Sequence, residues 1–484
     1  MRIDRLSSTP PSDSKMAATL IQGLTADSRA VQPGYLFAAL AGSATDGRRY
    51  IGQAIENGAA AILTDAPMVA GVPVLTSDNP RRELALMAAR FFETQPAHVA
   101  AITGTNGKTS SAVFLRQLLA ASGHKAAAMG TLGVEAEGYF APLQHTTPEP
   151  VRLHAALRDL AAHHVTYLAM EASSHGLAQY RLDGVTVQVA GFTNLSRDHL
   201  DYHATPEDYH AAKQRLFTEV LAADGTAVIV MGHAAGEAMA QAAEAAGRAV
   251  VPVGRPQDAV HIAITARRAA GLTLDVMLNG TGQSVDVPLI GDFQIENLTL
   301  ALGMAQAFGL DDATLFDACR QVQAPRGRMQ FVGCTAAGAY AYVDYAHTPD
   351  ALENALHALR AHLPAGKNLS VMFGCGGDRD AGKRPDMGAA AARLADRVYV
   401  TDDNPRHEAA GDIRAAIMTA CPQANEIADR AQAIKTALAD AGAGDIVLLA
   451  GKGHETGQIV GDKILPFDDI TAAQQCLAAQ GGAA

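Results

Sequence analysis

The sequence predicts an α/β fold divided into three domains. The chain has 484 residues, which is too long for a single hydrophobic core. Residues 99–102 are apolar and are followed by a glycine-rich loop and an amphipathic segment, the order of a strand, a phosphate-binding turn and a helix. Further along the chain, four apolar stretches each end in a polar or glycine-rich loop, as expected for a mostly parallel sheet.

The first domain, residues 1–96, is predicted to be a small α/β unit. Apolar side chains cluster at residues 35–40 and 60–63, which predicts two strands. An amphipathic stretch at residues 51–58 predicts a helix between them.

The second domain, residues 97–324, begins with the glycine-rich loop at residues 103–110. Glycines let backbone N–H groups surround phosphate oxygens, and the N-terminus of the following helix adds positive potential. Lys108 supplies a point charge, and the Thr109 hydroxyl can bind Mg²⁺. A tight turn before a core helix would leave the Gly-Lys-Thr run unexplained. Ile102 stands where the common phosphate loop has glycine, so a shortened loop is expected.

Strand and helix signals alternate through the rest of this domain and predict a mostly parallel sheet. The strand expected at residues 166–170 ends at Glu171, where nucleotide-binding sheets place a magnesium-binding acid; a solvated strand end is the alternative. Another strand, at residues 187–192, precedes a polar segment that contains His199, a weak metal-ligand candidate. From the sequence alone, Lys213 is a solvated lysine on a helix surface.

The third domain, residues 325–484, holds the four strands that end in polar loops. Thr348 and Pro349 predict a helix cap and the first helical residue. The segment 403–406 and the preceding Arg384 can bind a carboxylate, because the planar guanidinium matches carboxylate geometry; surface ion pairs are the alternative. The run at residues 451–455 is weak evidence for a second phosphate turn.

Composition excludes several classes of function. The net charge of −12 disfavours broad binding to nucleic acid or anionic lipid. No apolar run reaches about 18 residues, and the N-terminus lacks the apolar core of a signal peptide, so neither a membrane span nor export is expected. The cysteines are scattered without a C-x-x-C pair, which favours a reduced cytoplasm over a disulfide framework or a zinc site: Cys319, Cys334, Cys375, Cys421 and Cys476. Cys375 is expected to be a small packing residue.

Taken together, these segments resemble the Mur ligases of bacterial cell-wall synthesis. The resemblance spans essentially the whole chain and rests on eight segments in family order: 25–29, 103–110, 171–177, 194–203, 344–350, 374–380, 403–406 and 451–455. It implies a small N-terminal domain for the UDP end of the substrate, a central P-loop ATPase-type domain, and a Rossmann-like C-terminal domain that brings the amino acid.

The resemblance also implies the reaction. The D-glutamyl side-chain carboxylate of UDP-MurNAc-L-Ala-D-Glu would attack the γ-phosphate of ATP and become an acyl phosphate. The amine of an incoming amino acid would then displace phosphate, leaving an amide and ADP. An anion attacking another anion needs concentrated positive charge, which Lys108 and Mg²⁺ would supply.

Site residues follow from the same resemblance. Thr109 and Glu171 match ligands of a first magnesium, and His199 and Lys213 match a second metal site in which the lysine is carbamylated. The ATP-contacting positions are Gly104, Thr105, Asn106, Gly107, Lys108, Thr109, Ser110, Asn297, Arg328, Asp344 and His347. The UDP-muropeptide positions are Ser28, Thr146, Thr147, Ser173, Gln179 and Arg181.

For the amino acid, the segment Asp403, Asn404, Pro405 and Arg406 matches the diaminopimelate-adding branch. Arg406, aided by Arg384, is expected to pair with the distal carboxylate that lysine lacks, and Gly451 and Glu455 to hold the ammonium. Meso-diaminopimelate is therefore favoured over L-lysine.

Three positions depart from the family pattern. Gln294 replaces a frequent asparagine, residues 43–45 form a different uridine-side loop, and residues 407–411 are less acidic than expected.

The alternatives are a lysine-adding Mur ligase, a folylpolyglutamate synthetase, or a nucleotide-gated binding module without catalysis. In each enzymatic case the partners are small molecules, and a monomer is expected.

Overall fold

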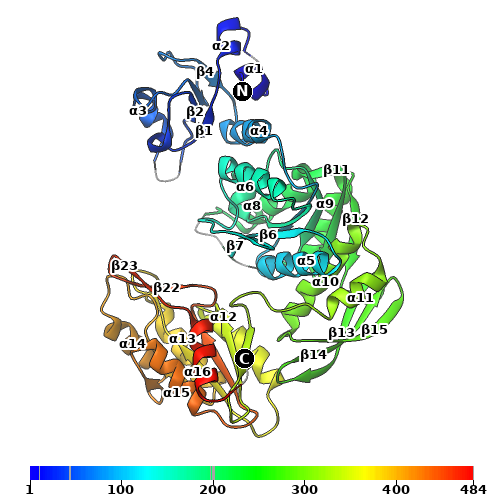
Figure 1. Cartoon of the computed structure of the whole chain (residues 1–484), viewed down its shortest axis with the longest axis vertical. Coiled ribbons are helices and arrows are strands. Elements are labelled where there is room, and N and C mark those ends of the chain that lie inside the picture. Colours follow the sequence, from blue (N-terminus) through cyan, green and yellow to red (C-terminus); the bar gives the residue numbers. More distant parts are fainter. Residues whose placement is uncertain (10, 43–44, 197, 199–201, 483–484) are drawn as a thin grey trace. The chain divides into compact units, whose positions relative to one another are not determined.

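The structure is a computed structural model that describes residues 1–9, 11–42, 45–196, 198 and 202–482. The chain forms two compact units, and α10 (Asp292–Ala307) contributes to both. The first unit contains residues 1–253 and 300–310. The second contains residues 254–299 and 311–484. Parallel sheets with covering helices occur in each unit, so the predicted α/β class is confirmed (Figure 1).

The N-terminal part of the first unit is built on a four-stranded parallel sheet in the order β1-β2-β3-β4. Its core unites Leu36 and Ala38 of β2 with Leu84, Met87 and Ala88 of α4. The predicted strands and helix are confirmed. The strand predicted at residues 35–40 and the helix predicted at residues 51–58 each end two residues earlier, and the strand predicted at residues 60–63 lies one residue later. The elements are α1 (Ile3–Leu6), α2 (Ser14–Ala18), β1 (Gly23–Thr25), η1 (Ser28–Ala30), β2 (Tyr35–Ala38), η2 (Gly47–Tyr50), α3 (Ile51–Glu56), β3 (Ala61–Thr64), β4 (Val74–Thr76) and α4 (Pro80–Phe92).

The rest of the first unit surrounds an eight-stranded sheet in the order β12-β11-β10-β5-β9-β6-β7-β8. Its first six strands are parallel, which confirms the mostly parallel sheet, and the edge strands β7 and β8 are antiparallel. The elements are β5 (His98–Thr103), α5 (Lys108–Ala121), β6 (Ala126–Gly130), β7 (Gly133–Ala136), β8 (Tyr139–Ala141), α6 (Pro150–Ala162), β9 (Tyr167–Glu171), α7 (Ser174–Ala178), β10 (Val187–Phe192), α8 (Pro206–Arg215), η3 (Leu216–Val220), β11 (Leu221–Val230), α9 (Ala234–Ala245) and β12 (Ala249–Val253).

Successive side chains of the central strands point to opposite faces of this sheet, and helices pack on both faces. Val99 and Ala101 of β5 join the core that contains Leu153 and Leu157 of α6 and Met239 of α9. On the neighbouring strands, α5 packs against β6 and β9. Both faces are therefore covered, as parallel sheets require, and only the carboxyl ends of the strands remain for polar loops.

The second unit begins with an antiparallel sheet of β13 (Val260–Arg268), β14 (Gly271–Leu278) and β15 (Thr281–Val287). The sequence predicts a mostly parallel sheet for residues 97–324, and for residues 260–287 of that range this prediction is wrong. The physical reason is the turn between β14 and β15. Asn279 and Gly280 have positive φ, 47° and 83°, and such a two-residue turn returns the chain directly into an antiparallel neighbour.

The remainder of the second unit surrounds a six-stranded sheet in the order β16-β17-β21-β18-β19-β20, in which only β16 is antiparallel among the described pairings. Thr348 caps α12 and Pro349 is its first residue, as predicted. The elements are α11 (Asp312–Cys319), β16 (Gln330–Cys334), β17 (Tyr340–Asp344), α12 (Pro349–His362), β18 (Leu369–Phe373), α13 (Lys383–Leu394), β19 (Arg397–Val400), α14 (Ala410–Met418), β20 (Asn425–Glu426), α15 (Arg430–Ala439), β21 (Ile446–Ala450), β22 (Gly457–Val460), β23 (Lys463–Pro466) and α16 (Asp469–Ala479).

Strand alternation again divides the core of this sheet between two faces. Val371 and Phe373 of β18 pack in the cluster that includes α12, α13 and α14 residues. Met372, between them, packs with Ile434 of α15 and Leu477 of α16 on the opposite face. Figure 1 shows these helices alongside the sheet. The hairpin of β22 and β23 pairs only with itself among the named strands of the described residues and lies outside this sheet.

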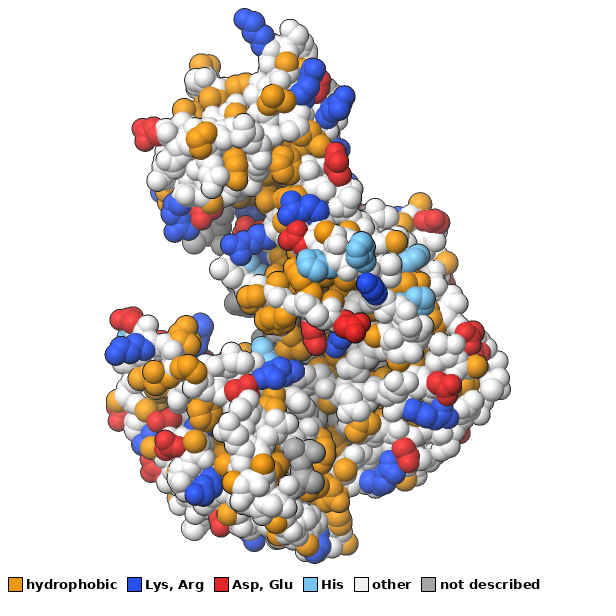
Figure 2. Space-filling view, in the orientation of Figure 1, with side chains coloured by type: hydrophobic (Ala, Val, Ile, Leu, Met, Phe, Trp, Pro, Cys, Tyr) orange, Lys and Arg blue, Asp and Glu red, His pale blue; other side chains and the backbone are white. Residues whose placement is uncertain are grey.

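Lys and Arg side chains are interspersed with Asp and Glu side chains on the face shown in Figure 2. No helix in the described ranges has the length and apolarity needed to span a bilayer.

Candidate active site

The glycine-rich loop connects β5 to α5 in the first unit. Gly104 and Gly107 have φ of 146° and 83°, values that other residues rarely adopt. A Cβ on Gly104 would lie 1.8 Å from the Thr193 hydroxyl oxygen, so a side chain cannot be accommodated there. The strand–loop–helix order predicted from residues 99–119 is confirmed, and the loop ends at the N-terminus of α5, where backbone N–H groups have no helical partner.

The segment after β10 braces this loop. The backbone N–H of Thr105 donates to Asn194 O at 2.9 Å, and that of Asn106 donates to Asn194 Oδ1 at 3.0 Å. The Thr193 hydroxyl donates to Asn106 O at 2.7 Å. Ser110 is buried in the first turn of α5. The loop is thus held from two strands, which preorganises a concave backbone before any phosphate binds.

Thr109 and Glu171 meet at the carboxyl ends of β5 and β9. The Thr109 hydroxyl donates to Glu171 Oε1 at 2.9 Å, and the backbone N–H of Thr131 donates to the same oxygen at 2.7 Å. Glu171 is only 2% exposed. Gly130 allows this approach, because a Cβ there would lie 2.1 Å from Glu171 Oε1. A hydroxyl and a buried carboxylate beside a phosphate-type loop form the hard oxygen donor set that Mg²⁺ prefers.

Lys213, on α8, is 1% exposed and points at the glycine-rich loop. Its Nζ donates to Gly104 O at 2.7 Å and lies 4.3 Å from the centre of the Tyr209 ring. Burial, and secondly the positive charge of Lys108, lower the pKa of Lys213 to about 6, although the negative charge of Asp198 acts in the opposite direction. The reading of Lys213 as a solvated surface residue is therefore wrong.

Five of the predicted UDP-muropeptide residues are connected to one another and to Glu171. The Thr131 hydroxyl shares a hydrogen bond with Thr146 at 3.1 Å and approaches Glu171 Oε2. The Thr147 hydroxyl donates to Glu171 O at 2.9 Å and accepts from the backbone N–H of Ser173. Arg181 continues the chain, donating to Thr147 O at 2.7 Å and to Gln179 Oε1 at 2.9 Å.

Two other predicted site residues, Ser28 and His199, are not among the connected residues described above. Ser28, the sixth predicted muropeptide residue, is buried in η1, where its hydroxyl donates to Gln53 Oε1 at 2.9 Å. His199 lies outside the described residues, as do Ser43 and Ala44 of the uridine-side loop. Within the described part of the chain, no group of three or more His, Cys, Asp or Glu side chains is arranged to hold a metal ion.

The remaining predicted ATP-contacting residues belong to the second unit. Asn297, on α10, donates to Gln294 Oε1 at 3.4 Å, and Gln294 donates to Arg328 O at 3.4 Å. Gln294 departs from the family pattern and is not among the predicted site residues, but it is fully buried and connects Asn297 to Arg328. Gln294 lies three residues before Asn297, so the two side chains share one helix face, and this spacing is the sequence signal that indicates Gln294 as a neighbour of the site.

Asp344 ends β17 and accepts hydrogen bonds from the backbone N–H groups of Met329 at 2.7 Å and Ala346 at 2.8 Å. Burial of its carboxylate raises the pKa of Asp344, and the nearby positive charge of Arg328 opposes that rise. His347 Nδ1 donates to Tyr345 O at 2.9 Å, and desolvation lowers the pKa of His347. These polar groups lie at the carboxyl edge of the sheet, as predicted.

The predicted amino-acid-binding segment follows β19. Asp403 and Asn404 are buried, and Asn404 O accepts from the backbone N–H of Gly377 at 2.9 Å. Arg406 donates from Nη1 to Gly377 O at 2.8 Å. Its backbone is left-handed, with φ of 52°, and is held on both sides by hydrogen bonds with Ile459 O at 3.0 Å and the N–H of Gly461 at 2.7 Å.

Arg384 already has an acidic partner within the chain. Its Nη2 lies 2.9 Å from both carboxylate oxygens of Glu408, and its side chain is only 6% exposed. Glu408 belongs to the segment that departs from the family pattern. The structure therefore places Arg384 beside the predicted amino-acid site with its guanidinium engaged by Glu408.

Cys375, in the loop after β18, is buried, and burial raises its pKa to about 12. Such a thiol stays protonated at neutral pH, so the expectation of a packing residue is confirmed.

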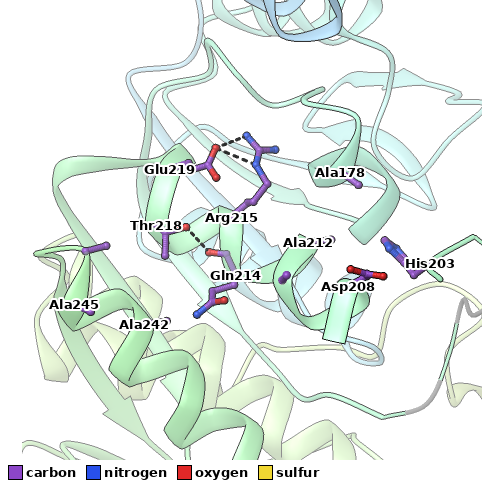
Figure 3. Close-up of a pocket in the computed structure, with 12 residues that line it drawn as sticks. Ala178, His203, Asp208, Ala212, Gln214, Arg215, Thr218, Glu219, Ala242 and Ala245 are labelled. Atoms are coloured by element: carbon purple, nitrogen blue, oxygen red, sulfur yellow. Dashed lines mark hydrogen bonds and ion pairs between the residues drawn. The ribbon is translucent and has the colours of Figure 1, made fainter. Parts of the chain in front are cut away.

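A pocket of about 740 Å³ lies beside α8 and α9 (Figure 3). Alanines form much of its wall, and Arg215 and Glu219 pair with each other at 2.8 Å. None of the predicted site residues lines this pocket. The predicted chemistry instead lies on the loops at the strand ends. The lining residues are Ala178, His203, Asp208, Ala211, Ala212, Gln214, Arg215, Thr218, Glu219, Ala242, Ala245 and Ala246.

Comparison with known proteins matches three consecutive segments of the chain to Mur ligase domains. Residues 20–101 match "Mur ligase family, catalytic domain", residues 102–305 match "Mur ligase middle domain", and residues 327–453 match "Mur ligase, glutamate ligase domain". These matches confirm the predicted three-domain organisation, whereas the boundaries at residues 96 and 324 stay a prediction.

Two relatives are similar over nearly their whole length. A UDP-N-acetylmuramoyl-L-alanyl-D-glutamate–2,6-diaminopimelate ligase from Bradyrhizobium diazoefficiens is 49% identical over 96% of both chains. The ligase of the same name from Agrobacterium fabrum is 48% identical over 96% of this chain and 95% of its own. A solved structure of a ligase with that name has a TM-score of 0.76 and 34% identity, covering 99% of both chains.

Proposed function

The chain belongs to the Mur ligase family, whose members are ATP-dependent, ADP-forming amide ligases, and we propose that it joins meso-diaminopimelate to UDP-MurNAc-L-Ala-D-Glu. The observation that carries the proposal is the similarity, over nearly the full length, to ligases named for that reaction. The arrangement of Lys108, Thr109 and Glu171 around the glycine-rich loop supports it independently.

We assign the nucleotide phosphates to the loop at residues 104–110. Its backbone N–H groups and the Lys108 ammonium would hold the phosphates and offset their charge. Thr109 and Glu171 fit a magnesium ion, which would polarise the transferring phosphoryl group. We assign the second metal position to His199 and to Lys213 as its carbamate. A neutral, buried amine is the form that can add to CO₂, and carbamylation would turn that nitrogen into an anionic oxygen ligand.

The proposed chemistry proceeds in two steps. An oxygen of the D-glutamyl carboxylate forms a bond to the γ-phosphorus while the bond to the bridging oxygen breaks, and ADP leaves. The neutral amine of the amino acid then attacks the acyl carbon, loses a proton and expels phosphate. The protein's contribution is to position both reactants and to neutralise charge, since a free carboxylate does not condense with an amine at neutral pH.

We assign the muropeptide to the connected residues Thr146, Thr147, Ser173, Gln179 and Arg181, with Ser28 towards the UDP end. Their connection to Glu171, directly through the Thr147 hydroxyl and indirectly through Thr131, supports this assignment, because the carboxylate to be activated must lie near the magnesium-binding acid. Asn297, Arg328, Asp344 and His347 are assigned to the remaining contacts of ATP.

We assign diaminopimelate to Arg384, Asp403, Asn404, Pro405, Arg406, Gly451 and Glu455. Arg406 would pair with the distal carboxylate. A site that presents a guanidinium to the distal carboxylate discriminates against a ligand that lacks this carboxylate, so we propose that L-lysine is the poorer substrate. A monomer in the cytoplasm stays our prediction.

The test is an amino-acid panel assayed with ATP, Mg²⁺ and UDP-MurNAc-L-Ala-D-Glu. Phosphate release and the mass of the amide product are measured for meso-diaminopimelate, L-lysine and L-glutamate. We expect product with meso-diaminopimelate and little with the others. Equal use of L-lysine would contradict the Arg406 assignment, and ATP binding without any amide product would favour a nucleotide-gated binding module.

A further inference from the structure

Lys452 is a fully buried cation that the proposed chemistry leaves without a role. It lies in the turn after β21, and its side chain is 0% exposed. Its Nζ donates to Asn404 Oδ1 at 2.9 Å and to Gly457 O at 2.8 Å. The same nitrogen is 3.4 Å from Asp403 Oδ1 and 3.6 Å from Glu455 Oε2. A lysine is rarely buried without such partners.

The partners of Lys452 include three side chains that we assign to the amino acid. Asp403 and Asn404 follow β19, whereas Glu455 follows β21, so the two groups come from different strands of the sheet. No hydrogen bond joins Asp403 directly to the Glu455 side chain among the described residues. Asn404 and Glu455 join the two loops by a direct hydrogen bond, and Lys452 adds a cation that lies close to the carboxylates of both Asp403 and Glu455.

Lys452 also determines which way the Asn404 amide faces. A lysine ammonium and a backbone N–H are donors only, so Asn404 Oδ1 must be the atom that accepts from Lys452 and from the N–H of Ile459, which donates at 2.9 Å. Nδ2 then faces Glu455 Oε2 and donates to it at 2.9 Å. Within the described residues, Glu455 Oε1 accepts no hydrogen bond, which leaves it for a substrate ammonium.

The formal charges of Asp403, Glu455 and Lys452 also favour the binding of an ammonium group. Asp403 and Glu455 contribute two carboxylates, and Lys452 offsets one of them, so the cluster has a net formal charge of −1 at neutral pH. An amino acid brings an ammonium to this position. Without Lys452, two carboxylates would repel each other and the Asn404 carbonyl would lose a partner.

We infer that Lys452 is the positioning residue of the amino-acid site: it fixes Asn404 and Glu455 so that they hold the ammonium end of the incoming amino acid. This inference rests on the proposed function. The polar contacts of Lys452 given above are with Asp403, Asn404, Glu455 and Gly457, so its replacement should change the use of the amino acid and not the activation of the muropeptide.

The experiment compares two reactions of the full chain. Hydroxylamine, a small nucleophile that needs no amino-acid site, traps the acyl phosphate as a hydroxamate in the presence of ATP, Mg²⁺ and UDP-MurNAc-L-Ala-D-Glu. In the Lys452→Met variant, hydroxamate formation should stay within about twofold of wild type. The KM for meso-diaminopimelate should rise at least about tenfold, because a buried amide loses its partner.

Two further variants make the test specific. Lys463→Met removes an exposed lysine from the neighbouring hairpin and should leave both reactions unchanged. Asn404→Leu should raise the same KM, and the double variant Asn404→Leu/Lys452→Met should resemble the worse single variant, because both act through one contact. Multiplication of the two effects would contradict the inference.

The failures are distinguishable. If wild type forms no hydroxamate and no amide, the proposed function fails. If wild type is active and Lys452→Met has an unchanged KM for meso-diaminopimelate, the positioning role fails. Equal loss of hydroxamate and amide formation in Lys452→Met would also overturn it, because that result means a general structural role.

Discussion

Lys108 and Lys213 donate to the same acceptor, the carbonyl oxygen of Gly104, at 2.8 Å and 2.7 Å. One lysine comes from the first turn of α5 and the other from α8, more than a hundred residues later. Two cations this close disfavour each other's charge, which contributes to the low pKa of Lys213. Burial and the nearby charge of Lys108 together lower the pKa of Lys213 to about 6, which favours its neutral form at neutral pH.

Replacing Lys108 should remove the activation step. In Lys108→Ala the positive charge beside the phosphates is lost, and we expect hydroxamate formation to fall by at least about a hundredfold. Circular dichroism should be unchanged, because the aliphatic chain is only partly buried. Normal turnover in this variant would contradict the assignment of the loop.

Replacing Lys213 should abolish activity, and an added carboxylate should restore part of it. Lys213→Ala lacks the amine that would carry the carbamate, so kcat should fall by at least about a hundredfold. Acetate or propionate should restore part of the activity by supplying a carboxylate. Lys435→Ala, which removes an exposed helical lysine, serves as the control. Full activity of Lys213→Ala without an additive would rule out the carbamate.

A methyl group at Gly130 should disturb the magnesium site. The Cβ of Gly130→Ala would lie 2.1 Å from Glu171 Oε1, so the carboxylate must move away from Thr109. We expect the Mg²⁺ concentration at half-maximal activity to rise at least about tenfold. Gly52→Ala, where a Cβ meets nothing within 4 Å, should behave as wild type. An unchanged Mg²⁺ requirement in Gly130→Ala would count against Glu171 as a ligand.

Arg406 should control the choice of amino acid. Arg406→Ala loses the guanidinium that would bind the distal carboxylate, so the KM for meso-diaminopimelate should rise by about a hundredfold while the KM for ATP stays unchanged. The preference over L-lysine should shrink in parallel. Arg393→Ala, at an exposed position on α13, is the matched control. Retained discrimination in Arg406→Ala would move selectivity to another residue.

His154 should make folding sensitive to acid. It is 3% exposed on α6, and burial lowers its pKa from 6.5 to about 4. The unfolded chain therefore binds this proton at a higher pH than the folded chain does. The stability that comes from keeping His154 neutral is fully present above pH 6.5. As the pH falls towards 4, the free energy of unfolding decreases by about 3 kcal/mol because the unfolded chain binds the proton first.

Urea unfolding of wild type and His154→Leu at several pH values checks this prediction. The difference in the free energy of unfolding between the two should change with pH below 6.5, whereas His145→Leu, an exposed control, should track wild type. Parallel pH profiles for wild type and His154→Leu would contradict it.

Several parts of the fold could be predicted because local signals and tertiary structure agree. The glycine-rich loop needs positive φ at Gly104 and Gly107, and the sequence supplies glycine at both. Glu171 follows an uninterrupted apolar strand, so its place at the sheet edge follows from strand length alone. The cap at Thr348 with Pro349 is equally local.

The antiparallel sheet of β13, β14 and β15 is not predicted, although the sequence holds a local signal for it. The pair Asn279-Gly280 between two strands is typical of a hairpin, but the alternation of strand and helix signals around it favours a parallel sheet. Lys213 is different. Nothing in its neighbours along the chain distinguishes it from a surface lysine, because its burial depends on a loop more than a hundred residues away.

The left-handed backbone at Arg406 has a consequence for efforts to make this enzyme more heat-resistant. A side chain at φ of 52° carries conformational strain of roughly 1 kcal/mol, which glycine would relieve. A screen that rewards only survival at high temperature would therefore favour glycine at this position, and, under the proposed role of Arg406, the surviving variants would no longer discriminate between building blocks.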